Sequence, residues 1–159
     1  EIIQRKTASL IAACCAAGAA SAGADPDRVE LMRSFGEEMG IAFQIKDDLL
    51  DFAPSTVTGK PSGGDVKERK MTLPLIHTLQ SLSTLQRRSM VRGIKRSKDN
   101  PNEAQRIMER ILEGPGMAYA ESKMKFHRDR AVALLEPLKD GAAKTALIEL
   151  VDFTISRKK

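Results

Sequence analysis

Residues 25–52 restrict the fold more than any other part of the chain, because they carry the pattern of one long helix. Asp25 followed by Pro26 is typical of a helix start, with the aspartate as N-cap and the proline at the first helical position. Apolar residues then recur at helical spacing up to residue 52, and Pro54 ends the pattern. No segment shows sustained period-two alternation, so we expect an all-α helical bundle without a sheet.

Similar patterns predict further helices along the rest of the chain. Residues 10–20 are apolar and rich in alanine, which indicates a buried helix. Ser83 and Gln86 have the spacing of a capping box, and Asn100-Pro101 is a second helix start. Pro74 lies either early in a helix or at a kink. The predicted helices cover residues 2–20, 25–52, 70–81, 83 onward, 101–112, 117–135 and 142–156.

The composition is that of a soluble globular protein. The 159 residues are 42% hydrophobic and 30% charged, and no apolar run approaches the roughly 20 residues of a membrane span. We expect one helical domain in three parts, residues 1–53, a loop at 54–69, and residues 70–159. Cys14 and Cys15 are adjacent and poorly placed to pair, so we expect small core residues in a reducing compartment, the cytoplasm.

The net charge of +5 raises the question of nucleic-acid binding. Basic residues cluster between Arg87 and Lys98 and again at Arg157 and the two residues after it. Aromatic residues make up only 4% of the chain, with no Trp and one Tyr, which leaves few platforms for base stacking. We therefore expect solvated helical faces and no nucleic-acid partner.

Three carboxylates, Asp47, Asp48 and Asp51, lie within five positions of the long predicted helix. Burial of an unpaired carboxylate costs several kcal/mol, and these are flanked by Ile45 and Leu49, so a cation is expected nearby. At roughly 100° per residue, Asp47 and Asp51 lie one turn apart with Asp48 beside them. Mg²⁺ prefers such oxygen ligands and shares them with substrate phosphates. A solvated acidic face is the alternative, and the apolar neighbours argue against it.

These residues belong to a longer pattern. Phe43-Gln44 followed by Asp47-Asp48-Leu49-Leu50-Asp51 resembles the second aspartate-rich motif of the trans-prenyltransferases, the isoprenyl diphosphate synthases. The other blocks are similar to the family's Lys-Thr pair and to its Gly-Lys, Gly-x-Asp and Lys-x-Thr-Leu-Pro segment: Lys6-Thr7, then Gly59-Lys60-Pro61-Ser62-Gly63-Gly64-Asp65, then Lys70 and Thr72-Leu73-Pro74. Three blocks in the family's order are a specific signal, and the resemblance extends over essentially the whole chain.

The chain departs from the family pattern in one respect. The family has a first aspartate-rich motif upstream of the Lys-Thr pair, whereas no aspartate precedes Asp25 here. The resemblance therefore implies the C-terminal portion of the isoprenoid synthase fold, and we expect this polypeptide alone to lack turnover.

The resemblance implies a reaction and a role for each matching residue. An allylic diphosphate would ionise and condense with isopentenyl diphosphate to give a longer trans-polyprenyl diphosphate, with Mg²⁺ as cofactor. Asp47 would be the main metal ligand, supported by Asp48 and Asp51. The remaining expected site residues are lysines that face the diphosphate and polar groups beside the cationic carbons: Lys6, Lys60 and Lys70, then Thr7 and Gln44.

Several expectations come with this interpretation, and alternatives stay open. The family's synthases are typically homodimers, so we expect a homodimer. A non-catalytic helical subunit that pairs with a synthase, or a terpene cyclase of related fold, would share much of the pattern. Phe43 is expected to pack in the core, with a cation–π contact as the alternative. No catalytic role is assigned to His77 or His127, which have no metal-binding residues near them in sequence.

Overall fold

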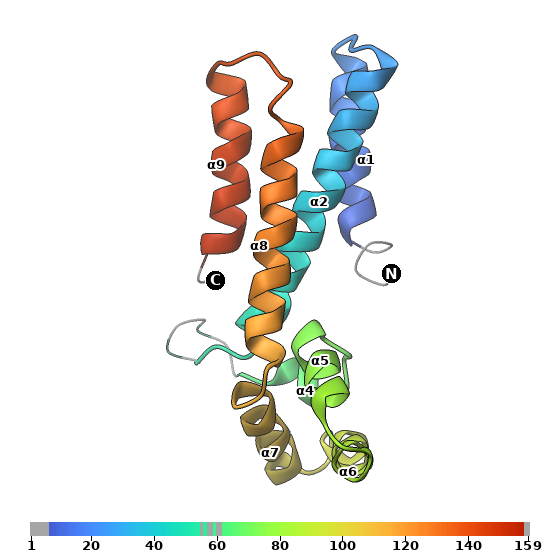
Figure 1. Cartoon of the computed structure of the whole chain (residues 1–159), viewed down its shortest axis with the longest axis vertical. Helices are drawn as coiled ribbons and strands as arrows, with labels where there is room; N and C mark the ends of the chain where they lie inside the picture. Colours follow the sequence, from blue (N-terminus) through green and yellow to red (C-terminus); the bar gives the residue numbers. More distant parts are fainter. Residues whose placement is uncertain (1–6, 55, 57–58, 60–61, 158–159) are drawn as a thin grey trace. The chain divides into compact units, whose positions relative to one another are not determined.

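The computed structural model describes residues 7–54, 56, 59 and 62–157. Within these residues the chain forms helices and no strand, as expected from the periodicity (Figure 1). The helices are α1 (Ser9–Ser21), α2 (Pro26–Leu50), α4 (Gly64–Lys67), α5 (Leu73–Ser81), α6 (Thr84–Arg96), α7 (Pro101–Leu112), α8 (Gly116–Leu134) and α9 (Ala142–Ser156).

The described residues divide into two compact units. The first contains residues 7–46 and 123–157, and the second contains residues 47–122, so that α2 and α8 each contribute to both. Each unit has its own hydrophobic cluster. Phe35 is fully buried in the first cluster with Ala131, Leu135 and Val151, whereas Leu75 and Ile111 are fully buried in the second.

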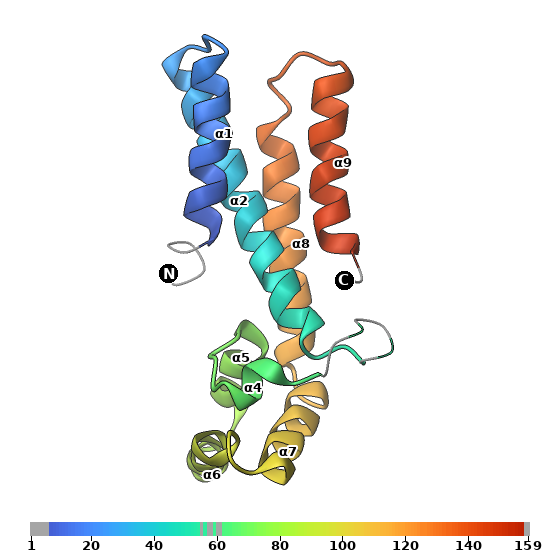
Figure 2. The same ribbon diagram turned by 180° about the vertical axis from the view of Figure 1, so that it is seen from behind.

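In the first unit, α1 and α2 run side by side at close range, in both the front and the rear view (Figure 2). A Cβ atom added at Gly40 would lie 2.6 Å from the Cα atom of Ala8, and one added at Gly36 would lie 2.8 Å from the Cα atom of Ala12. Such distances are below van der Waals contact, so only glycine permits this approach of the two backbones. The alanine-rich sequence of α1 supplies the other half of the contact.

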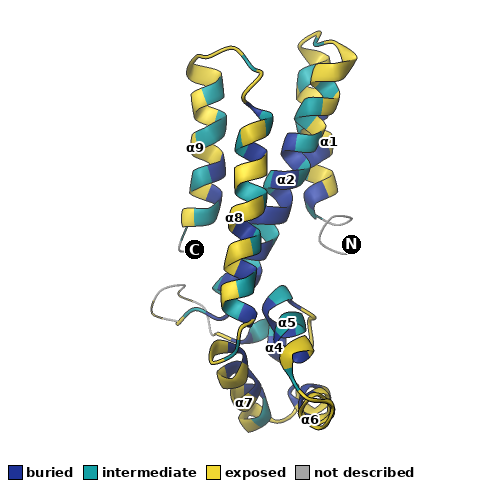
Figure 3. Cartoon of the chain, in the orientation of Figure 1, coloured by how far each residue is buried: buried dark blue, intermediate teal, exposed yellow. Residues whose placement is uncertain are grey.

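The expectation that residues 10–20 form a buried helix is wrong for one side of α1. Ala8, Ala12 and Ala16 face α2 and are buried, but the side chain of Leu10 is 65% exposed and Cys14 is exposed (Figure 3). Cys14 is therefore not a core residue, while Cys15 is half-buried in the first cluster. Uniform hydrophobicity showed that α1 has an apolar surface, but it did not show how much of that surface α2 covers.

Polar contacts stabilise the start of α2 and join its middle to α8 within the first unit. Asp25 accepts a hydrogen bond from the backbone N–H of Arg28 at 2.9 Å, which confirms the predicted cap. Further along, the buried carboxylate of Glu38 lies 2.6 Å from Nδ1 of His127 and 2.9 Å from the guanidinium of Arg130, both on α8. His127 thus has a structural partner that links α2 to α8.

The second unit is built from short helices with well-formed ends. Ser83 and Gln86 form the predicted capping box at the start of α6, and the side chain of Asn100 accepts from two backbone N–H groups at the start of α7. Pro74 lies in the first turn of α5 and does not kink it. Gly116 begins α8 where a Cβ atom would collide with the carbonyl oxygen of Pro74. The starts of α6, α7 and α8 agree with the predicted boundaries to within one residue, whereas α5 begins at Leu73, three residues after the predicted start.

One helix was not predicted. Helix α4 lies inside residues 54–69, which the composition indicated as a loop. Gly63 adopts φ +78° just before it, and Val66 is buried in the second cluster. Four residues are too few for periodicity to reveal, and the turn is stabilised by contacts with α2 and α7 that are distant in sequence.

Among the helices that the structure describes, none combines the length and the hydrophobicity needed to cross a membrane.

Candidate active site

Two of the three predicted carboxylates, Asp47 and Asp48, lie in the last turn of α2, and Asp51 directly follows the helix. The structure gives the three unequal environments. Asp48 is buried, whereas Asp47 and Asp51 are half-buried. Oδ2 of Asp48 accepts a hydrogen bond from the backbone N–H of Leu73 at 3.3 Å. Leu73 is the first residue of α5, whose own N-cap residue makes no side-chain cap. Asp48 therefore serves as the acceptor for the start of a neighbouring helix.

Asp51 has the same kind of role at the start of α4. Its Oδ2 accepts from the backbone N–H of Asp65 at 3.0 Å, and its carbonyl oxygen accepts from Gly63 at 2.9 Å. A Cβ atom added at Gly64 would lie 3.2 Å from Oδ1 of Asp51, so glycine leaves room for the carboxylate there. Asp51 thus fixes the end of the Gly-rich segment to the end of α2.

The pKa of the Asp51 carboxyl is raised, chiefly because the group is removed from water. The negative charge of Asp65 raises this pKa further. Hydrogen bonds from the backbone of Asp65 and Gly64 and the positive charge of Lys70 act in the opposite direction. A nearby cation would favour the ionised form of this carboxylate and so lower its pKa.

Lys70 is paired with carboxylates of its own segment. Its Nζ donates to Oδ1 of Asp65 at 2.8 Å and lies 2.9 Å from Oε2 of Glu68. These two hydrogen bonds raise the pKa of Lys70 above its ordinary value. Its predicted contact with a diphosphate stays a prediction, because a phosphate would have to compete with both carboxylates.

The structure brings together two other predicted residues in the first unit. The hydroxyl group of Thr7 donates to Oε1 of Gln44 at 3.2 Å, although the residues are 37 positions apart. The neighbouring Phe43 has the guanidinium of Arg157 over its ring, 4.2 Å from the centroid. Phe43 is half-buried under this arginine, and a cation–π role at the candidate site stays a prediction. Lys6 and Lys60 lie outside the described residues.

Thr72 is a residue of this region to which the sequence assigned no role. It precedes Leu73 at the start of α5 and is 4% exposed, yet its hydroxyl group has no hydrogen-bond partner among the described residues. A buried hydroxyl without a partner is uncommon in native proteins. Thr72 belongs to the Lys-x-Thr-Leu-Pro block, and this position in a motif is the sequence signal by which it could have been selected.

The donor atoms at the end of α2 are compatible with a hard cation. Carboxylate oxygens are the ligands that Mg²⁺ prefers, and one or two of them suffice when phosphate oxygens and waters complete the shell. No group of three His, Cys, Asp or Glu side chains within the described part of the chain is arranged to enclose a metal. An ion held here by Asp47, or by Asp47 with a second carboxylate, would therefore take its remaining ligands from substrate and solvent.

Comparison with known proteins assigns these features to a family. The polyprenyl synthetase family model matches residues 1–111, which include every candidate residue described above except Arg157. The chain belongs to the polyprenyl synthetase family. Its fold is accordingly that of the helical isoprenyl synthases.

Members of the polyprenyl synthetase family align with almost the whole chain. A short chain isoprenyl diphosphate synthase of Methanothermobacter thermautotrophicus is 36% identical over 99% of this chain and 48% of its own length. A nonaprenyl diphosphate synthase of Mycobacterium tuberculosis is 33% identical over 99% of this chain and 47% of its own length.

A solved structure gives the same result for the fold. The polyprenyl synthase from Caulobacter crescentus, complexed with calcium and isoprenyl diphosphate, is 34% identical and superimposes with a TM-score of 0.89 over 99% of this chain and 48% of the other. The chain spans about half the length of the curated relatives it matches.

Proposed function

We propose that the protein carrying this chain is a prenyltransferase that condenses an allylic diphosphate with isopentenyl diphosphate to form a longer trans-polyprenyl diphosphate. The observation that carries the proposal is the extent of the family match, since residues 1–111 contain all three motif blocks. The names of the relatives, which are prenyl diphosphate synthases, support the same reaction class.

The reaction needs charge stabilisation more than it needs a protein nucleophile. The bond between the allylic carbon and the diphosphate oxygen breaks, and the electron pair leaves with the oxygen. The double bond of isopentenyl diphosphate then attacks the allylic cation, and loss of a proton forms a new double bond. Fixed positive charge beside the departing oxygens lowers the barrier to the first step.

In this scheme the carboxylates at the end of α2 would bind the divalent cation beside the diphosphate. Mg²⁺, which is part of the proposal, would stabilise the charge that develops on the leaving diphosphate. Asp47 is the proposed main ligand. Asp48 and Asp51 are proposed to support it while their hydrogen bonds keep α4 and α5 at the end of α2. The calcium complex of the Caulobacter synthase supports a divalent cation as part of this proposal.

The polar pair of the first unit fits a different part of the same reaction. Thr7 and Gln44 present neutral oxygen dipoles within 3.2 Å of each other. Such dipoles stabilise a neighbouring carbocation without an ionised nucleophile that would trap it. Lys6 and Lys60 are proposed to face the diphosphate oxygens as compact positive charges.

Three further proposals concern the protein as a whole. We place the enzyme in the cytoplasm, with no nucleic-acid partner. We propose a homodimer, because Leu150 and Phe153 of α9 are 46% and 64% exposed and leave apolar surface for a subunit contact. Light scattering of the purified protein tests the dimer, and a monomer at micromolar concentration would contradict it.

A product assay tests the proposed reaction. The natural full-length protein is incubated with radiolabelled isopentenyl diphosphate, Mg²⁺ and a series of allylic diphosphate primers, and the products are separated by chain length. We expect label in extended prenyl diphosphates and none when Mg²⁺ is chelated. Failure to elongate any primer would contradict the proposal and favour the non-catalytic subunit, whereas cyclic hydrocarbon products would favour a terpene cyclase.

A further inference from the structure

Helix α6 and its flanks form the longest stretch of the chain with charges of a single sign. From Lys70 to Lys98 there is no Asp or Glu, while seven basic residues occur: Lys70, Arg87, Arg88, Arg92, Lys95, Arg96 and Lys98. The family's reaction, as described above, uses only Lys70 of this set. The proposed reaction assigns no role to the other six basic residues.

The charges lie on the side of α6 that faces away from the second cluster. Met90, Gly93 and Ile94 are buried on the inner side. At roughly 100° per residue, Arg88, Arg92 and Lys95 share the opposite side, and all three are exposed. We call the surface formed by Leu85, Arg88, Val91, Arg92 and Lys95 the basic face of α6.

Two other arginines of α6 have internal roles and do not belong to this face. Arg87 donates to the carbonyl oxygens of Leu79, Gln80 and Leu82 and so caps the end of α5. Arg96 lies 3.5 Å from Glu103 of α7. These contacts account for Arg87 and Arg96 without an external partner.

The three charges of the basic face have no such internal role. Arg92 donates to the backbone carbonyl of Arg88 at 3.4 Å, which leaves its charge uncompensated. No carboxylate in the described part of the chain forms an ion pair with Arg88, Arg92 or Lys95. The basic face therefore presents three uncompensated positive charges to its surroundings.

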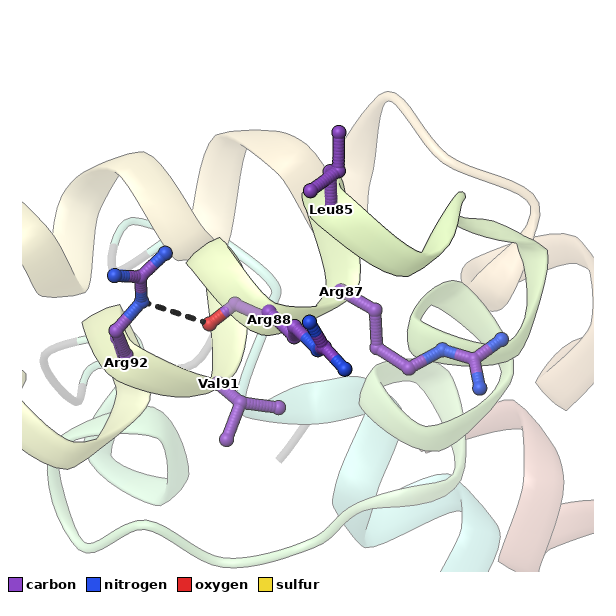
Figure 4. Close-up of a pocket in the computed structure, with 5 residues that line it drawn as sticks. All are labelled: Leu85, Arg87, Arg88, Val91 and Arg92. Carbon is purple, nitrogen blue, oxygen red and sulfur yellow. Dashed lines mark hydrogen bonds between the residues drawn. The ribbon is translucent and has the colours of Figure 1, made fainter.

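Apolar side chains stand among these charges. Leu85 is 78% exposed and Val91 is 38% exposed. An open hollow of about 580 Å³ lies along the helix, lined by Leu85, Arg87, Arg88, Val91 and Arg92 (Figure 4). Figure 4 shows Leu85 and Val91 projecting from the helix on different sides of the arginines. Exposed leucine and valine that flank a group of basic residues are the combination of apolar and cationic side chains found on helices that lie at a lipid surface.

We propose that the basic face of α6 docks on an anionic phospholipid bilayer surface. The long side chains of Arg88, Arg92 and Lys95 reach the lipid phosphates, while Leu85 and Val91 enter the region between the headgroups. Helix α6 carries no aromatic residue, so it has no platform on which the bases of a nucleic acid would stack. The inference is independent of the proposed reaction, because none of the five residues belongs to the motif blocks.

Vesicle sedimentation tests the proposal with the intact protein. Vesicles of neutral phosphatidylcholine are compared with vesicles that contain about one third phosphatidylserine, at low salt and at physiological salt. We expect binding to the anionic vesicles only, weakened as salt increases, because screening reduces attraction between exposed charges. Equal binding to both vesicle types, or binding to neither, would overturn the proposal.

Two charge-matched variants locate the surface. The triple variant Arg88→Gln, Arg92→Gln, Lys95→Gln removes three charges from the basic face, and the control Arg28→Gln, Lys125→Gln, Lys139→Gln removes three exposed charges elsewhere. Since each basic residue near an anionic membrane strengthens binding severalfold, we expect the first variant to bind on the order of 10- to 100-fold more weakly. The control should bind within about twofold of the natural protein. Equal losses in both variants would show that only net charge matters and would overturn the assignment.

Two more measurements separate lipid docking from charge attraction alone and from nucleic-acid binding. Leu85→Ser keeps every charge, and we expect a loss of a fewfold in binding that salt does not abolish. Circular dichroism should show unchanged helix content in all variants. An oligonucleotide that binds the basic face more tightly than the anionic vesicles do would replace the lipid surface with a nucleic acid and overturn the proposal.

Discussion

The acidic end of α2, formed by Asp47, Asp48 and the adjoining Asp51, and the basic face of α6 are both groups of three like charges close together in sequence, but the structure places them in opposite environments. Asp48 is buried and Asp51 half-buried, and both accept backbone N–H groups from neighbouring helices. Arg88 and Lys95 are exposed and make no ion pair with the described carboxylates.

The internal partners of a charge cluster indicate its role. Carboxylates that accept backbone N–H groups hold neighbouring helices in place, so their removal should reduce stability. Charges without internal partners contribute little to stability, so their effect should be on what the protein binds. Substitutions in the two regions test this contrast.

The largest expected effect is on catalysis. Asp47→Ala should lower turnover of the full-length protein on the order of 10²–10³-fold, because positive charge beside the leaving diphosphate would no longer be held. Helix content by circular dichroism should stay unchanged. Asp27→Ala, at the exposed start of α2, is the control and should retain turnover. Normal turnover of the Asp47 variant would refute its role as the main ligand.

A stability comparison addresses the contrast directly. Asp48→Ala should lower the free energy of unfolding by about 1–3 kcal/mol, because the backbone N–H of Leu73 loses its acceptor. Arg88→Ala should change it by less than about 0.5 kcal/mol. Urea unfolding at neutral pH measures both.

A second substitution separates the hydrogen bond from the negative charge of Asp48. Asp48→Asn keeps an acceptor oxygen and should lose less stability than Asp48→Ala. If the alanine variant were as stable as the natural protein, the carboxylate would not be the cap that its geometry indicates.

A smaller effect is expected from two glycine-to-alanine substitutions, one at an open position of α1 and one where the Gly-rich segment, residues 59–65, meets the end of α2. Gly18→Ala, in α1 with no atom within 4 Å of the added Cβ, should raise the free energy of unfolding by about 0.5–1 kcal/mol. Gly64→Ala should not, because its Cβ would press on Oδ1 of Asp51 and disturb the bond to Asp65. Thermal unfolding of the two variants measures the difference, and an equal gain would mean that Asp51 does not fix this segment.

The smallest effect concerns an exposed charge. The hydrogen bond and the charge of Lys70 lower the pKa of Glu68. A carboxyl group with a lowered pKa in the folded state adds stability above its unfolded pKa, and this contribution is lost as the pH falls below about 4. Glu68→Gln should therefore be slightly less stable at pH 7 and indistinguishable in strong acid. Glu121→Gln, an exposed control on α8, should show no such pH dependence in a melting series.

Local signals were sufficient for the helix boundaries. Asp25, Ser83 and Asn100 each cap the helix that they were predicted to start, because a cap depends on residues within one turn. Local signals failed at α1, where the degree of burial depends on α2, and at α4, which is stabilised from outside its own four residues.

The candidate site was predictable as a set of residues but not as an arrangement. The motifs named both Thr7 and Gln44, and the structure shows a hydrogen bond between them that the motifs did not predict. Nothing in the spacing indicated that Asp48 would accept a backbone donor of α5 and Asp51 one of α4. The roles of Lys6 and Lys60 stay predictions.

The all-helical architecture, most helix ends and the family could be inferred from the order of the residues alone, since periodicity, caps and ordered motifs depend on neighbouring residues. Which charges are used internally became clear only from the packing of the folded chain. Hydrogen bonds such as Leu73 to Asp48 join residues 25 positions apart, and burial depends on the neighbours that folding brings together. Two clusters that are alike as sequence thus became an anchor for two helices at the end of α2 and an exposed basic surface on α6.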